Sequence, residues 1–315
     1  MTTKAINAPL KKNSWRLDIK RNWMVYLIFL PTFLLFLVLN YVPMFGIVMA
    51  FEDYNVADGY FHSPWVGLKH FIDLFSGEDF LQAIRNTVVI GVLKSTIGFI
   101  APIIFALMLS LINSKKFKRA AQTMSYLPNF VAAVIVCSLF TQFLAKDGPL
   151  TLLLTRLFGA ENQNWLANDR PPVFWIIYLM MGIWQSVGWG SIMYVAAISQ
   201  VSGDLHEAAA LDGATRLQRL FKITLPSIFP MIVMMFVINI GTALAAGYDN
   251  ILLLYMPSTY SVSDTVYTYT YRQAFGGGNA NYSLSAASGL FQSVISTILL
   301  VISNNLSRKT GSSLF

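Results

Sequence analysis

The stretch SGDLHEAAALDGATRLQRLFKITLP, residues 202–226, decides how the rest of the chain is interpreted. It predicts a short helix, a sharp turn and a second short helix. Asp204 is expected to cap the first helix, with Glu207 three residues later in capping-box spacing. Gly213 stands where a left-handed residue closes a helix, and Pro226 is expected to end the second helix before the next apolar segment.

The second half of this stretch also has an apolar face, formed by Leu217, Leu220 and Phe221. A compact helical loop of this kind suits insertion into a groove on a partner protein, with its apolar side buried and its arginines around the contact. The alternative is an amphipathic loop that lies on a membrane surface. The residues of the loop leave both interpretations open.

Outside the loop the chain is dominated by long apolar segments. It is 55% hydrophobic and only 12% charged, against about a quarter charged in soluble domains. A helix of about 20 apolar residues crosses a bilayer. The pattern therefore predicts an all-α polytopic membrane protein with six transmembrane helices, near 23–51, 86–112, 123–145, 173–200, 227–255 and 284–306.

Lysine and arginine concentrate in alternate polar segments of the chain, namely 1–22, 113–122, 201–226 and the C-terminal end. The positive-inside rule places these segments and both termini in the cytoplasm. We expect a basic cytoplasmic segment over 1–22 and a transmembrane domain over 23–315. Topology explains the net charge of +7, so no nucleic-acid partner is expected.

Several fixed positions in the loop resemble the "EAA" signature of ABC-importer permeases. They are Glu207-Ala208-Ala209, Asp212-Gly213-Ala214 and Leu225-Pro226. The resemblance implies a type I importer permease fold, and a loop that couples the chain to an ATP-hydrolysing subunit. The residues that it assigns to coupling are Glu207, Ala208, Ala209, Asp212, Gly213 and Pro226.

Other segments are similar to the carbohydrate-uptake branch of the same family: Arg85-Asn86-Thr87, Gln122 to Pro128, and Asn304 to Lys309. The resemblance implies sugar import across the bacterial cytoplasmic membrane. It also implies two cytoplasmic ABC ATPases, a second and distinct permease, and an external solute-binding protein. ATP and Mg are expected on the ATPases, because this chain has no G-x-x-x-x-G-K-[ST] loop and no cofactor site.

Polar and aromatic side chains within the apolar segments are candidates for a substrate path. In the fifth segment Asn239 and Asp249 share one face of a continuous helix, and ionisable residues at membrane depth usually face a bundle interior. Aromatic rings beside an amide, in the fourth segment, suit a sugar. Packing between helices is the alternative for each of them. The full set is Asp249, Tyr248, Asn239, Trp184, Gln185, Trp189, Gln292 and Lys94.

Lys94 lies inside the second apolar segment. It can extend to the membrane surface, pair with Asp249, or neutralise an anionic substrate. The last possibility predicts transport of an acidic oligosaccharide.

Other function classes find less support in the sequence. A permease for another solute and an ATP-independent channel remain as alternatives, but the chain has no ring of acidic residues. Catalytic motifs such as H-E-x-x-H and G-x-S-x-G are absent from it, and with one cysteine and three histidines no metal site is expected. We therefore expect a transporter subunit that is not an enzyme.

Overall fold

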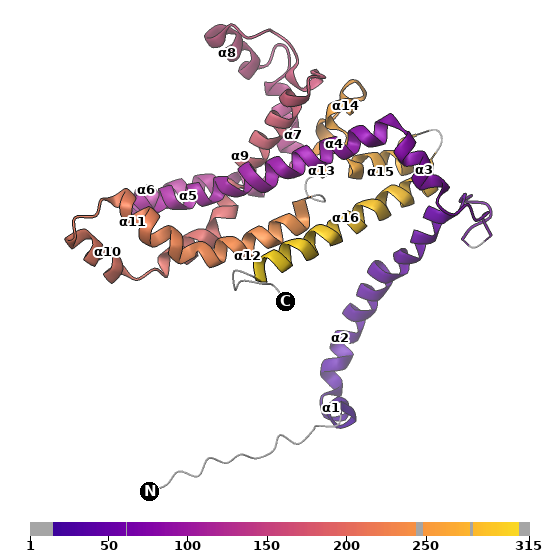
Figure 1. Cartoon of the computed structure of the whole chain (residues 1–315), viewed down its shortest axis with the longest axis horizontal. Helices are drawn as coiled ribbons and strands as arrows, with labels where there is room; N and C mark the ends of the chain where they lie inside the picture. The colour runs from indigo at the N-terminus through magenta and orange to yellow at the C-terminus, as the bar shows by residue number, and fades with distance from the viewer. Residues whose placement is uncertain (1–14, 61, 244–247, 278–279, 309–315) are drawn as a thin grey trace.

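The computed structural model describes residues 15–60, 62–243, 248–277 and 280–308 (Figure 1). Within these ranges every regular element is helical, and the only extended pairing is an isolated bridge between Glu52 and Trp65. The predicted all-α class is therefore confirmed.

Five helical stretches of the described chain are long and apolar enough to cross a membrane. They are Trp23–Phe51, Glu78–Leu111, Pro171–Ser199, Arg216–Ile240 and Tyr282–Asn305. Their α-helical parts are α2 (Trp23–Phe36), α4 (Glu78–Leu93) with α5 (Phe99–Leu111), α9 (Pro171–Ser199), α11 (Arg216–Arg219) with α12 (Leu225–Ala243), and α16 (Tyr282–Arg308).

The third predicted span is bent instead of straight. Helix α6 (Lys115–Tyr126) continues as a 3-10 turn over Leu127–Phe130, and α7 (Ala133–Phe143) then leaves at 98°. Pro128 lacks an amide hydrogen, and Val131, which follows the 3-10 turn, is extended with ψ 130°. If this bent pair counts as one span, the described chain has the six spans that were predicted.

Two other span boundaries differ from the prediction. The second span begins at Glu78, ahead of the predicted 86–112. The fifth runs over Arg216–Ile240 in place of 227–255, and residues 248–254 form a separate helix, α13 (Tyr248–Leu254).

Three of the spans contain a π-helical turn shortly before a proline. The turns are η1 (Leu37–Tyr41) before Pro43, η3 (Lys94–Gly98) before Pro102, and η6 (Leu220–Thr224) before Pro226. A proline cannot donate to the carbonyl four residues back. The wider turn lets the helix pass this position without ending, so Pro226 does not end the helix as predicted.

Shorter helices join the spans. They are α3 (Lys69–Ser76), α8 (Pro149–Phe158), α10 (Gly203–Leu211), α14 (Tyr260–Ser263) and α15 (Val266–Phe275), with 3-10 turns at Trp165–Ala167 and Pro257–Thr259. Helix α1 (Trp15–Arg21) precedes the first span.

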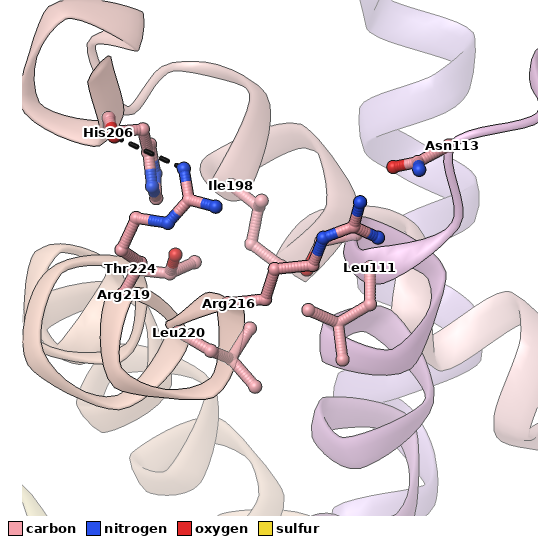
Figure 2. A pocket seen from close by; sticks show the side chains of 9 residues that line it. Leu111, Asn113, Ile198, His206, Arg216, Arg219, Leu220 and Thr224 are labelled. Carbon is pink, nitrogen blue, oxygen red and sulfur yellow. Dashed lines mark hydrogen bonds between the residues drawn. The ribbon is translucent and has the colours of Figure 1, made fainter. Parts of the chain in front are cut away.

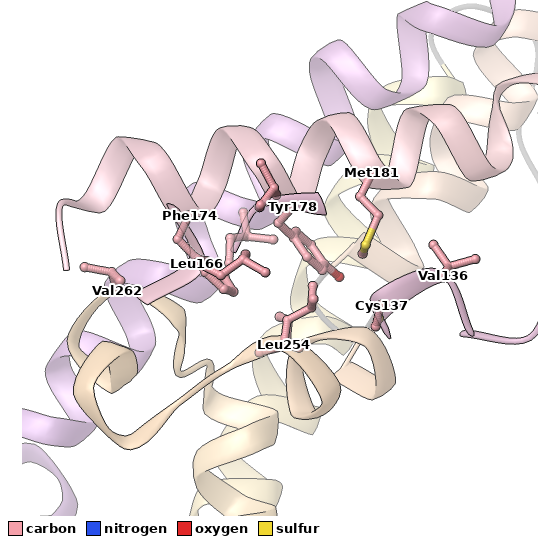
Figure 3. Close-up of a cluster of buried hydrophobic side chains, with 11 residues drawn as sticks. Val136, Cys137, Leu166, Phe174, Tyr178, Met181, Leu254 and Val262 are labelled. Carbon is pink, nitrogen blue, oxygen red and sulfur yellow. The ribbon is translucent and has the colours of Figure 1, made fainter. Parts of the chain in front are cut away.

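Helix α9 is central to the core: it packs against α5 in one buried cluster and shares another with α7 and α13. Phe174, Tyr178 and Met181 of α9 belong to one buried cluster with Val136 and Cys137 of α7 (Figure 3). The Cys137 thiol also lies 3.7 Å from the Asn250 carbonyl oxygen, joining α7 to α13. This cluster fixes α9 relative to the elements around it.

Helix α2 is the exception to this packing. It extends away from the other helices (Figure 1) and has no buried residue. Only the end of its span, at Ala50 and Phe51, joins a cluster with α3, α4, α15 and α16. The first span therefore leaves its apolar surface open along most of its length.

Candidate functional site

The loop between the fourth and fifth spans has the shape that the sequence predicts. Helix α10 ends in a turn at Gly213, which has φ +80°. The Ala214 amide donates to the Ala209 carbonyl (2.9 Å) and the Gly213 amide to the Ala210 carbonyl (3.1 Å). This is a Schellman closure, which requires a left-handed residue and favours glycine.

The capping of the two loop helices differs from the prediction. Ser202, not Asp204, caps α10, because its hydroxyl accepts from the Asp204 amide at 3.2 Å. The capping box lies at the second helix. There Thr215 and Gln218 bond reciprocally, at 2.7 and 3.3 Å. Two ordered helix starts therefore hold the turn between them.

The loop exposes apolar side chains. Leu211 is 90% exposed, and Leu205, Leu217 and Phe221 are also exposed. Arg219 does not surround this surface as expected: its Nη1 donates to the His206 carbonyl at 3.1 Å. The loop therefore exposes four large apolar side chains.

The predicted coupling residues all belong to this loop. Glu207, Ala208, Asp212, Gly213 and Pro226 are exposed, and Ala209 is half-buried. They are accessible to a partner.

A cavity of about 230 Å³ lies between the second, fourth and fifth spans. It brings together three of the predicted path residues: Lys94 from the π turn after α4, Gln185 from α9 and Asn239 from α12. Gln185 is held by a 3.3 Å hydrogen bond from its Nε2 to the Val131 carbonyl. Residues distant in sequence thus bring several polar groups to one cavity between the spans.

The other predicted path residues do not line this cavity. Trp184 packs near Phe140, with ring centroids 5.9 Å apart, and Trp189 near Phe130, at 5.6 Å. Gln292 belongs to α16. The side chains of Tyr248 and Asp249 lie outside the described residues. Residues 244–247 also lie outside them, and the predicted shared face of Asn239 and Asp249 depends on a continuous helix there.

Sequence reasoning missed several residues of this cavity. Tyr178, Gly182, Ser186 and Asn250 also line it. On α9 the positions 178, 182, 185 and 186 follow helical spacing, so extending the face of Gln185 backwards would have found Tyr178. Asn250 comes from another helix, and no local pattern brings it here.

A hydrogen-bonded cluster in the middle of α4 involves the Arg85-Asn86-Thr87 segment. The Asn86 side chain, 0% exposed, donates to the carbonyls of Asp264 (2.8 Å) and Ser261 (3.2 Å). The Thr87 hydroxyl accepts from the Val266 amide at 2.8 Å. These bonds fix the segment between α14 and α15 against the second span.

The family model for "Binding-protein-dependent transport system inner membrane component" matches residues 98–312. The chain belongs to this family. It is thus a multi-pass permease component of the inner membrane, and the prediction of a transporter subunit that is not an enzyme is confirmed.

The match to one relative covers nearly the whole permease. The "Polygalacturonan/rhamnogalacturonan transport system permease protein YteP" of Bacillus subtilis (strain 168) is 40% identical, over 91% of this chain and 88% of its own.

Two solved structures are similar to this permease throughout. One is a chain of "a bacterial ABC transporter involved in the import of the acidic polysaccharide alginate", with TM-score 0.84 and 38% identity, covering 94% of this chain and 98% of that one. The other is the bacterial alginate ABC transporter "in complex with alginate pentasaccharide-bound periplasmic protein", with the same TM-score and identity over 95% and 98%. These likenesses confirm the predicted type I importer permease fold.

Proposed function

We propose that this permease imports a uronic-acid oligosaccharide by alternating access, as one of two membrane chains driven by two ATPase subunits and supplied by an external solute-binding protein. The observation that carries the proposal is Lys94 in the cavity between the spans. Of the described residues that line this cavity, Lys94 is the only charged one.

The chemistry of the lining suits an acidic sugar. The Lys94 ammonium can pair with a carboxylate, at a depth where charge is rarely placed without function. Gln185, Ser186 and Asn239 offer amide and hydroxyl groups to sugar hydroxyls. Likeness to transporters of polygalacturonan and of alginate, both acidic polysaccharides, supports the same substrate class.

A second membrane chain is supported by two observations. The cavity, at about 230 Å³, is smaller than the roughly 300–1,000 Å³ of small-molecule sites, as expected of one part of a shared path. Helix α2 has no buried residue. We place the second permease against α2.

The ATPase subunits are placed on the loop 202–226. Its exposed apolar side chains, Leu205, Leu211, Leu217 and Phe221, suit the groove of a partner, with Glu207, Ala208, Ala209, Asp212, Gly213 and Pro226 as the coupling residues. The loop lies at the same end of the molecule as the start of the basic helix α6 (Figure 1), which supports a cytoplasmic location for both. Both termini are placed on this cytoplasmic side.

Affinity purification of the tagged chain from its host membranes, in mild detergent, tests the assembly. We expect an ATPase and a second permease to co-purify. Glu207→Arg should lose the ATPase and keep the permease, whereas Glu161→Arg, an equivalent exposed acid elsewhere, should keep both. A chain that purifies alone under several gentle conditions would contradict the proposal.

Uptake into proteoliposomes tests the substrate class. The assembled transporter, with binding protein outside and ATP inside, should accumulate a labelled oligogalacturonide and exclude a neutral maltooligosaccharide of equal length. The opposite preference would contradict the proposed acidic substrate without contradicting the proposed assembly.

A further inference from the structure

A second cavity, of about 250 Å³, lies where three spans end beside the loop (Figure 2). It is bounded by the end of α5, the end of α9, helix α10 and the helix that starts at Arg216. Its lining residues are Ser110, Leu111, Asn113, Ile198, His206, Arg216, Arg219, Leu220 and Thr224.

The polar side of this cavity is cationic. Arg219 extends toward His206, and Arg216 toward Asn113 (Figure 2). With the Asn113 amide oriented to satisfy its neighbours, its oxygen accepts from both terminal nitrogens of Arg216, at 3.1 and 3.2 Å. Both guanidinium groups are therefore held in place by neutral oxygens, Arg216 by this amide and Arg219 by the His206 carbonyl.

Neither arginine is neutralised within the described chain. The one ion pair found there joins Arg272 to Asp264, so no described carboxylate lies within 4.0 Å of Arg216 or Arg219. The Nε of Arg219 is buried and has no hydrogen-bond acceptor among the described residues. Two guanidinium groups without a counterion, around a cavity, attract an anion.

The rest of the lining is apolar. Leu111, Ile198 and Leu220 form it, and these residues stand at the ends of spans that cross the membrane. A ligand that satisfies both sides carries an anionic head and an apolar remainder, and basic pockets between helices at a membrane surface bind the heads of anionic lipids.

We propose that this cavity binds the phosphate of an anionic phospholipid between Arg216 and Arg219. Guanidinium groups bind phosphate oxygens through paired hydrogen bonds, and neither guanidinium here has a described carboxylate as its partner. The bound phosphate would connect the loop to the ends of α5 and α9, adding a membrane contact to the surface that meets the ATPase.

The test is native mass spectrometry of the full chain with its partner subunits in neutral detergent, titrated with phosphatidylglycerol or phosphatidylcholine. We expect phosphatidylglycerol to bind at least tenfold more tightly. Arg216→Gln and Arg219→Gln should each remove most of this preference. Lys222→Gln, at an exposed cation of the same helix outside the cavity, should preserve it. If Arg219→Gln disturbs the loop because the bond to His206 is lost, the Arg216→Gln variant still tests the proposal.

A third titration, with inorganic phosphate, identifies the source of the anion. Competition by millimolar phosphate that is lost in both arginine variants would support a phosphate site open to free anions. Equal binding of the two lipids together with no effect of phosphate would overturn the proposal. An equal loss in Lys222→Gln would also overturn it, because general surface charge would then explain the preference.

Discussion

The ammonium nitrogen of Lys94 lies 5.6 Å from the centroid of the Tyr178 ring, a cation–π distance. Tyr178 is itself fixed in the buried cluster beside Phe174 and Met181. The sequence allowed the Lys94 side chain to extend to the membrane surface. In the structure it lies against Tyr178 instead. The charge is held over an aromatic face that also borders the cavity.

Replacement of Lys94 tests whether this charge selects the substrate. Lys94→Met should lower uptake of an oligogalacturonide at least tenfold, because the carboxylate loses its only described cation in the cavity. Lys94→Arg should retain most uptake. Initial rates in proteoliposomes measure this, with Lys222→Met as a control outside the cavity. Unchanged uptake in Lys94→Met would remove Lys94 from the substrate path.

Gly213 is expected to contribute to coupling through its backbone conformation alone. An added Cβ meets nothing within 4 Å, but φ is +80°, and a left-handed alanine costs about 1–2 kcal/mol. Gly213→Ala should therefore weaken substrate-stimulated ATP hydrolysis by the assembled complex, and Gly213→Asn less so. Gly203→Ala, which also meets nothing and has no positive φ, is the matched control. Equal activity in both alanine variants would show that the loop tolerates another turn.

Gly188 should be required for the packing of α9 on α6. A Cβ at this position would collide with the carbonyl of Ser125, and backbone cannot move aside as a side chain can. Overpacking of this kind costs roughly 1–3 kcal/mol. Gly188→Ala should lower the melting temperature of the detergent-solubilised protein by about 5 °C. Gly182→Ala on the same helix, where a Cβ meets nothing, should not lower it, and a similar loss in both variants would argue against this contact.

Asn86 should stabilise the packing of α14 and α15 against the middle of α4. Asn86→Ala removes the side-chain donor to the Asp264 carbonyl, and it leaves the Ser261 carbonyl with the Arg85 guanidinium alone, at a cost of about 1–3 kcal/mol. We expect faster proteolysis between α14 and α15 and weaker stimulation of ATP hydrolysis by the binding protein. Asn168→Ala, whose side chain accepts only from the nearby Arg170 amide, is the control. Unaltered proteolysis in Asn86→Ala would show that the other bonds suffice.

The existence of the spans could be predicted from apolar length, whereas the boundaries of the second and fifth spans and the bend in the third could not. The loop turn could be predicted because one glycine is required at one position, Gly213. The residue that caps α10 could not be predicted. Ser202 and Asp204 are both good N-cap residues, and the choice depends on which of them leaves the helical conformation. The residues Val266 to Tyr271 alternate with the spacing of a strand, but the segment is helix α15. Thr265 begins it with a capping box, and its contacts with α16 outweigh strand propensity.

The cavity was only partly predictable. Polar residues within apolar spans could be identified one by one, and Lys94, Gln185 and Asn239 do meet. Which of them meet depends on how α4, α9 and α12 pack together, and no spacing along the chain contains that information. Trp184 and Trp189 share a helix with Gln185, but they pack against Phe140 and Phe130 and do not line the cavity.

The π turn before Pro226 affects the direction in which side chains of the fifth span point around the helix axis. Leu220, Thr224 and Ile228 are all buried, at steps of four residues. In a pure α-helix each such step advances a side chain by about 40° around the axis. The turn Leu220–Thr224 takes more residues per revolution, which offsets that drift and keeps the three on one side. Deleting a single residue there would rotate Leu217 and the loop before it by about 100° relative to the membrane helix. This one turn therefore sets the direction in which the loop presents its leucines.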